Sequence, residues 1–190
     1  MDRADEIIDT VLALDSLSDL PRTGWRLRGV RPGESIADHV FGVTLVTAML
    51  TDVLREQGVE IDGERALRLA IVHDAAEART GDIPMPVKSK AFSEAVADVE
   101  QRIVEGMLPA AWTAWWQEAE EGRTLEARVV KAADKIQMMA RALSYERQGR
   151  GDLQEFWDNP ANFRHMDIAV AKSVYERLVE RRNRLVDRSG

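Results

Sequence analysis

The segment Leu69-Ala70-Ile71-Val72-His73-Asp74-Ala75-Ala76-Glu77-Ala78 decides the fold that we expect for this chain. It belongs to a predicted helix that Asp62 caps and Gly81 ends. Ionisable side chains in such an apolar helix cost several kcal/mol unless other groups pair with them. His73, Asp74 and Glu77 are spaced to project toward one side of the helix. A divalent metal would satisfy an imidazole and carboxylates together. The alternative is a solvated polar stripe or a satisfied core histidine.

The rest of the chain also has helical periodicity, because apolar residues recur at spacings of three and four, with no convincing strand pattern. Helices are predicted at about 3–17, 35–58, 62–80, 88–107, 110–121, 124–149 and 161–187. The first has Ile7, Ile8, Val11, Leu12 and Leu14 on one side, and 20–33 is expected to be a loop. We therefore predict an all-α helical bundle that forms a single domain over residues 1–190.

The amino-acid composition excludes several classes of chemistry and of binding partner. The chain has 190 residues, a net charge of −7 and no cysteine, so disulfides, thiolate catalysis and cysteine metal sites are excluded. The acidic balance argues against binding a nucleic-acid polymer. No apolar run approaches the roughly 20 residues of a membrane span, and the first ten residues do not resemble a secretory signal. We expect a cytoplasmic protein with no membrane partner.

Two further residues are candidate ligands. His39 lies near the start of the second predicted helix, where a histidine that only begins the helix is the alternative. Asp134 lies in a mostly apolar helix, although aspartate has poor helix propensity; it could instead pair with Lys131 or Lys135. Together with His73 and Asp74, these residues give the order H…HD…D on three helices.

This pattern resembles the HD-domain metal-dependent phosphohydrolases, an all-α family, and within it the 5′-deoxynucleotidases. The resemblance is strongest over residues 7–150, and the tail helix 161–187 is unmatched. The strings that carry it are Arg22, Trp25, Arg28-Gly29-Val30, Glu34 to His39, His73 to Pro84, Pro86-Val87-Lys88, Lys131 to Asp134 and Tyr145-Glu146.

The resemblance implies that His39, His73, Asp74 and Asp134 hold one divalent cation. This ligand set suits Mn, Co, Fe, Ni or Zn better than Mg or Ca, without choosing among them. Glu77 would be the general acid that protonates the leaving 5′-oxygen. Its alternative role is to orient His73 as a neighbouring carboxylate.

The resemblance also implies a set of substrate contacts. Asp82 would contact the sugar hydroxyl, and Arg22 would bind the phosphate through its planar fork of donors. Lys88 is a further candidate for the local positive field that attracts a nucleotide. Trp25 would either stack on the base or anchor its loop to the core.

The expected activity is release of phosphate from nucleoside 5′-monophosphates. A triphosphohydrolase acting on deoxynucleoside triphosphates is the alternative, because the segment between Asp74 and Asp134 is shorter than in typical bacterial monophosphatases. A nucleotide-binding module that has lost its activity would be expected to lack one of the four metal ligands or the general acid. In this sequence the four ligand positions and Glu77 are all present. The resemblance also implies a homodimer, because members of the family form dimers, and the tryptophan-rich helix 110–121 is a second indication.

Overall fold

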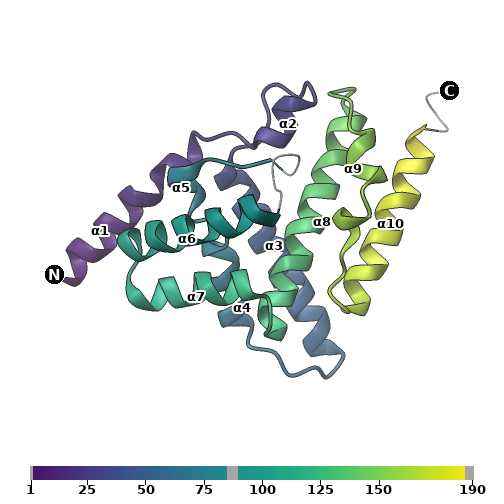
Figure 1. Ribbon diagram of the computed structural model, residues 1–190. Coiled ribbons are helices and arrows are strands. Elements are labelled where there is room, and N and C mark those ends of the chain that lie inside the picture. Colours follow the sequence, from purple (N-terminus) through teal and green to yellow (C-terminus); the bar gives the residue numbers. More distant parts are fainter. Residues whose placement is uncertain (1, 85–89, 187–190) are drawn as a thin grey trace.

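The computed structural model describes residues 2–84 and 90–186, with side chains over 2–84 and 94–186. In this part every regular element is helical (Figure 1), which confirms the predicted fold class. The helices are α1 (Arg3–Leu14), α2 (Thr23–Leu27), α3 (Ile36–Glu56), α4 (Gly63–Val72), α5 (Glu77–Thr80), α6 (Lys90–Met107), α7 (Ala110–Glu121), α8 (Leu125–Arg147), α9 (Gln154–Asp158) and α10 (Ala169–Val186), with 3₁₀ turns at Asp15–Ser18 and Pro160–Phe163.

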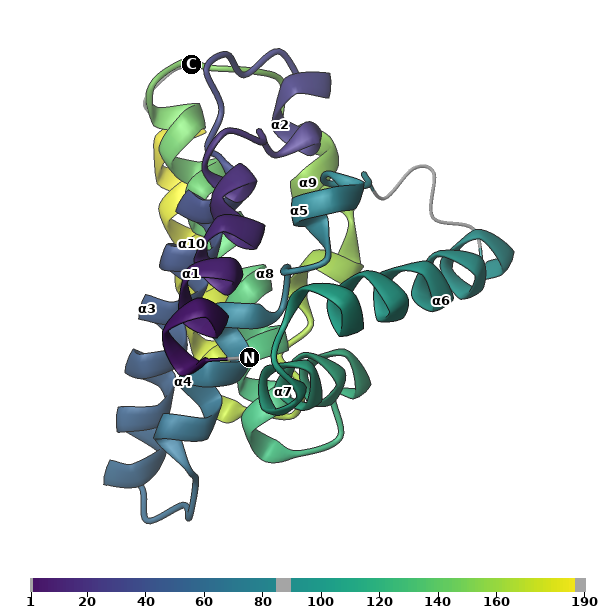
Figure 2. The same ribbon diagram turned by 90° about the vertical axis from the view of Figure 1, so that its left-hand side faces the viewer.

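The two longest helices, α3 and α8, form the centre of the bundle. They pack against each other and against α4, while α7 covers α4 and α10 covers α8. Figure 2 shows α6 extending away from this centre beside α7. The main core is made by apolar side chains from all these central helices, including Val43, Leu50, Leu69, Val130, Ile136, Met139 and Tyr175.

Capping residues fix where the central helices begin. Ser35 and Asp38 form a reciprocal capping box at the start of α3. The Asp62 side chain accepts a hydrogen bond from the backbone of Arg65 at the start of α4, and Thr124 does the same for Ala127 at the start of α8. Each cap contributes about 1 kcal/mol. The predicted starts at Ser35, Asp62 and Thr124 are therefore correct.

The helix predicted over 62–80 is not continuous. α4 ends at Val72, and α5 begins at Glu77. Between them the backbone donors of Ala75, Glu77 and Ala78 bond three residues back instead of four. This tighter winding places side chains three positions apart over one another. The break therefore aligns Asp74 with Glu77.

The apolar side of the first helix is not covered in the structure. α1 has no buried residue, and Ile7, Ile8, Val11 and Leu12 are all more than half exposed. Its amphipathic pattern is real, but α1 lies at the edge of the bundle, and in the described part of the chain its neighbours are the 3₁₀ turn at Asp15–Ser18 and α6 (Figure 1).

α3 also differs from what its sequence indicated. It is one helix that, by length and composition, is apolar enough to cross a membrane, contrary to our expectation that no such run exists. Here it packs between α4 and α8. Phe41, Leu45 and Met49 nevertheless lie exposed along one side.

The C-terminal segment is the other correction. The helix predicted over 161–187 is present but starts later, as α10 at Ala169, and the first residues of that range belong to the 3₁₀ turn Pro160–Phe163. The short helix α9 precedes this range. Pro160 starts the turn, and Met166 and Asp167 have left-handed backbone angles of φ 53° and 61° that no α-helix can continue through. The expected loop 20–33 likewise contains the short helix α2.

Candidate metal centre and substrate cavity

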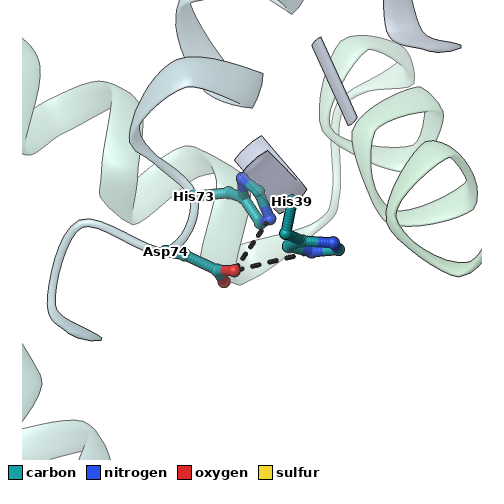
Figure 3. Close-up of side chains that lie close together, drawn as sticks. All are labelled: His39, His73 and Asp74. Atoms are coloured by element: carbon teal, nitrogen blue, oxygen red, sulfur yellow. Dashed lines mark ion pairs between the residues drawn. The ribbon is translucent and has the colours of Figure 1, made fainter. Parts of the chain in front are cut away.

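The four predicted ligands come together from three helices. His39 lies on α3, His73 and Asp74 follow the end of α4, and Asp134 lies on α8. His39 Nε2 is 3.6 Å from Asp74 Oδ2 and 3.3 Å from Asp134 Oδ1, and His73 Nε2 is 3.3 Å from Asp74 Oδ2. Figure 3 shows the side chains of His39, His73 and Asp74 converging on one point.

Both imidazoles are held by their other nitrogen. His73 Nδ1 lies 2.8 Å from the carbonyl oxygen of Ala70, and His39 Nδ1 lies 2.6 Å from Gln137 Oε1. Both Nε2 atoms are buried and have no hydrogen-bond partner within the described residues. Two unpartnered imidazole nitrogens beside two carboxylates fit a divalent transition-metal ion.

The charge of the cluster also favours a cation. Burial alone lowers the pKa of His73, but the adjacent Asp74 carboxylate more than offsets this effect and the pKa rises to about 9. Asp134 is paired with the ammonium of Lys135 at 3.0 Å, so one of the two pairings that the sequence left open is formed. Lys131 instead donates to the backbone of Glu120.

Glu77 lies beside this cluster, with its Oε2 buried and without a hydrogen-bond partner in the described part of the chain. Burial, followed by repulsion from the Asp74 carboxylate, raises its pKa to about 9. Arg22 Nη1 lies 3.7 Å from Glu77 Oε2 and 3.4 Å from Asp74 Oδ2. Burial and the neighbouring carboxylate thus favour the protonated form of Glu77, which lies near the ligands.

Asp82, which follows α5, is hydrogen-bonded to the start of α2. Its Oδ2 accepts from the backbone N–H of Thr23 at 2.5 Å, and its carbonyl accepts from the Thr23 hydroxyl. Its Oδ1 lies 3.5 Å from Arg22 Nη1. Burial alone would lower the pKa of Arg22, but the neighbouring carboxylates of Asp74 and Asp82 raise it. Arg22 and Asp82 therefore hold each other at the edge of the cluster.

A cavity of about 410 Å³ opens onto these residues. Asp74, Glu77 and Asp134 line it together with Arg22 and Asp82. Another part of its wall comes from the C-terminal segment that the sequence left unmatched. Its contributors are Glu155, Phe156, Asn159 and Asn162. Sequence reasoning also missed Lys135 and Met138 as lining residues. Met138 follows Asp134 on α8 by four residues, a spacing that places the two on the same side of the helix.

Trp25 lines the same cavity, but it is only 2% exposed. Its ring stacks on Phe156 and its Nε1 donates to Glu34 Oε1 at 2.8 Å. This is the packing expected of a loop anchor, and Phe156 covers one of the ring faces that a base would need.

The remaining predicted cation, Lys88, lies outside the described residues. The tryptophans of α7 pack inward, with Trp116 buried and Trp112 and Trp115 against the core. They therefore form a packed helix face and do not mark an exposed subunit contact.

Comparison with known families identifies the fold. The family model described as HD domain matches residues 14–172. The chain belongs to the HD-domain family. The match continues beyond residue 150, into the segment that supplies the cavity wall. HD domains bind divalent metal, and His39, His73 and Asp74 form the corresponding cluster here.

Two curated relatives of this HD-domain protein are named 5′-deoxynucleotidases. The 5′-deoxynucleotidase HDDC2 of Homo sapiens is 30% identical over 182 residues, covering 91% of this chain and 86% of the relative. The 5′-deoxynucleotidase hdd1 of Schizosaccharomyces pombe is 34% identical over 161 residues, covering 79% and 78%.

Solved structures agree on the fold. A protein from Pyrococcus horikoshii OT3 is 35% identical with a TM-score of 0.78, covering 93% of this chain and 98% of that chain. The HD phosphohydrolase DatZ of cyanophage S-2L, bound to dA and one catalytic Zn²⁺ ion, has a TM-score of 0.61 at 22% identity, covering 93% and 96%. At that identity the likeness concerns the fold alone.

Proposed function

We propose that this HD-domain protein is a metal-dependent 5′-deoxynucleotidase that releases inorganic phosphate from nucleoside 5′-monophosphates. The observation that carries the proposal is the placement of the Glu77 carboxyl group beside the His39, His73 and Asp74 cluster, where Asp74 and Glu77 line a cavity of about 410 Å³. Relatives named 5′-deoxynucleotidase support it over most of the chain.

His39, His73, Asp74 and Asp134 would hold one divalent cation, with Mn, Co, Zn, Ni and Fe as the candidates. When bound, such a cation supplies positive charge for the phosphoryl group and acidity for a nucleophilic water. The chain has three histidines in total, and two of them belong to this cluster.

Glu77 would donate the proton that the leaving 5′-oxygen needs, because an alkoxide departs poorly at neutral pH. Arg22 would hold the Glu77 carboxyl in place and present the rest of its fork to the phosphate. Lys135, whose ammonium lines the cavity beside Asp134, would add a second positive charge there.

The nucleoside would lie between Asp82 and the wall made by Phe156. We propose that Asp82 contacts the sugar hydroxyl, since it lines the cavity while its Oδ2 is held by Thr23. Trp25 is proposed to shape this wall through Phe156. Lys88 remains a proposed contact on sequence grounds.

Product analysis tests the activity. Protein loaded separately with Mn²⁺, Co²⁺ or Zn²⁺ is given dAMP and dATP in parallel, and the products are separated by chromatography. We expect orthophosphate and deoxyadenosine from dAMP, with the activity abolished in Glu77→Ala. Inorganic triphosphate from dATP with intact dAMP would overturn the proposal in favour of a triphosphohydrolase.

We propose that the protein is a cytoplasmic homodimer and does not bind nucleic-acid polymers, consistent with its charge of −7. Phe41, Leu45 and Met49 recur every four residues along α3 and are 72%, 52% and 62% exposed. A second copy would cover this stripe. Light scattering should give twice the mass of one chain, and Leu45→Glu should halve it. A monomeric unmodified protein would contradict the dimer.

A further inference from the structure

Glu34 is a buried carboxylate whose side chain is fully shielded from solvent. Three donors reach it. Trp25 Nε1 donates to Oε1 at 2.8 Å, whereas Gln137 Nε2 at 3.0 Å and Arg141 Nε at 2.7 Å donate to Oε2. An ionised carboxylate only accepts hydrogen bonds. The Gln137 amide must therefore turn its NH₂ group toward Glu34.

The orientation of Gln137 then determines the tautomer of His39. With its NH₂ group on Glu34, Gln137 presents Oε1 to His39 Nδ1 at 2.6 Å. Since this oxygen only accepts, Nδ1 must carry the hydrogen. In the neutral ring, the lone pair of His39 is consequently on Nε2, the atom that faces Asp74 and Asp134.

The fold makes room for this arrangement. Gly42, one turn beyond His39 on α3, faces Gln137, and a Cβ atom there would lie 2.7 Å from Gln137 Cγ and 3.0 Å from Nε2. Glycine inside a helix costs roughly 1 kcal/mol relative to alanine. Its place in the middle of α3 is explained by the space that the Gln137 side chain needs.

We propose that Glu34 and Gln137 are positioning residues that act through His39: the Glu34–Gln137 relay fixes the His39 tautomer that binds the divalent cation. The other histidine needs no such relay, because His73 Nδ1 faces a backbone carbonyl. The relay rests on the proposed metal site, and it adds two side chains that bind neither metal nor nucleotide.

Zn²⁺ affinity, measured by competition with a chelator, tests the relay without using activity. Gln137→Met keeps the side-chain length but removes the acceptor, and we expect Zn²⁺ binding to weaken about 10- to 100-fold. In the Zn²⁺-loaded unmodified protein, a slowly exchanging Nδ1–H of His39 should be visible by NMR, and it should be lost in this variant. Gln148→Met, an exposed glutamine at the end of the same helix, is the matched control and should bind Zn²⁺ normally.

Two further substitutions test the direction of the relay. Glu34→Gln should weaken binding, because an amide at position 34 no longer forces the Gln137 NH₂ group toward it. The exchange Glu34→Gln with Gln137→Glu restores an acceptor toward His39 and a donor toward that acceptor, at the cost of the acceptor that Glu34 Oε2 offers to Arg141 Nε. The double variant should therefore lose less Zn²⁺ affinity than the fold losses of the two single variants multiplied together.

Gly42→Ala gives independent evidence, since it displaces Gln137 without removing a polar group. It should weaken Zn²⁺ binding, whereas Gly106→Ala, where a Cβ meets no heavy atom within 4 Å in the described part of the chain, should not. Folded variants of Gln137 and Gly42 that bind Zn²⁺ like the unmodified protein would overturn the relay. Unmodified protein that binds no Zn²⁺ would instead overturn the metal site itself.

Discussion

The indole of Trp25 stacks on the ring of Phe156, with centroids 4.6 Å apart and planes inclined by 15°. This contact joins α2 to α9 across most of the sequence and closes one side of the cavity. Phe156→Ala should therefore raise KM for dAMP several-fold while changing kcat little, because Phe156 lines the cavity but is none of the groups proposed to hold the cation or donate the proton. Steady-state kinetics measure both constants.

Phe163→Ala is the control for this substitution. Phe163 packs behind the wall, against Trp157 and Tyr175, and does not line the cavity. It should lower the free energy of unfolding without raising KM. Equal effects of the two variants on KM would show that the wall does not contact the substrate.

The raised pKa of Glu77 predicts how kcat depends on pH. Its pKa of about 9, raised by burial and then by Asp74, keeps it protonated at neutral pH. A general acid works only while protonated, so kcat should fall as the pH rises through this pKa. A bound cation favours the ionised carboxylate, and the falling limb is therefore expected at or below pH 9. Asp82→Asn should retain this limb, and a flat profile up to pH 10 would contradict the role of Glu77.

Metal removal should destabilise the fold. The ligands come from α3, the end of α4 and α8, so a cation that binds only the folded chain stabilises it. At a free concentration one hundred times Kd, the gain is about 2.7 kcal/mol, which corresponds to roughly 5–10 °C in Tm for a chain of this size. Calorimetry with Zn²⁺ and after chelation measures it. Asp74→Asn should show little of this shift, and a full shift in that variant would remove Asp74 from the ligand set.

Two neighbouring glycines give a test of packing. Gly149 and Gly151 both have left-handed angles, φ 66° and 76°. At Gly151 a Cβ would lie 2.5 Å from Val30 Cγ2 and 2.8 Å from the Arg28 carbonyl, but at Gly149 it would meet no heavy atom within 4 Å in the described residues. Gly149→Ala should cost about 1 kcal/mol of backbone strain. Gly151→Ala should cost clearly more in chemical denaturation, and equal costs would contradict the tight contact.

The features that could be predicted from the sequence are those set by interactions between residues close together in the chain. Caps at Ser35, Asp62 and Thr124 mark helix starts because their side chains bond the nearby backbone. The ligand candidates were found because ionisable residues interrupt apolar helices. The break after Val72 was missed, since nothing in a run of alanines shows that the backbone winds more tightly. The exposure of Ile7 and Leu12 was missed because periodicity shows that a face is apolar without showing what covers it.

The cavity wall was beyond sequence reasoning for another reason. Phe156, Asn159 and Asn162 carry no pattern of their own, and they meet Trp25 and Met138 only through the turn at Pro160 and the packing of α10. Glu34 and Gln137 are similar, since their partnership spans about one hundred residues of chain. Only the spacing of three between Asp134 and Gln137 pointed to a shared face.

The division of the cavity between two parts of the chain has a consequence for how such a protein can diversify. The groups proposed to carry out hydrolysis lie between residues 22 and 135, whereas another part of the wall comes from residues 155–162. Substitutions in this short stretch can reshape which nucleoside fits without altering the cation or the proton donor. Substrate preference and reaction chemistry can therefore change independently in descendants of this fold.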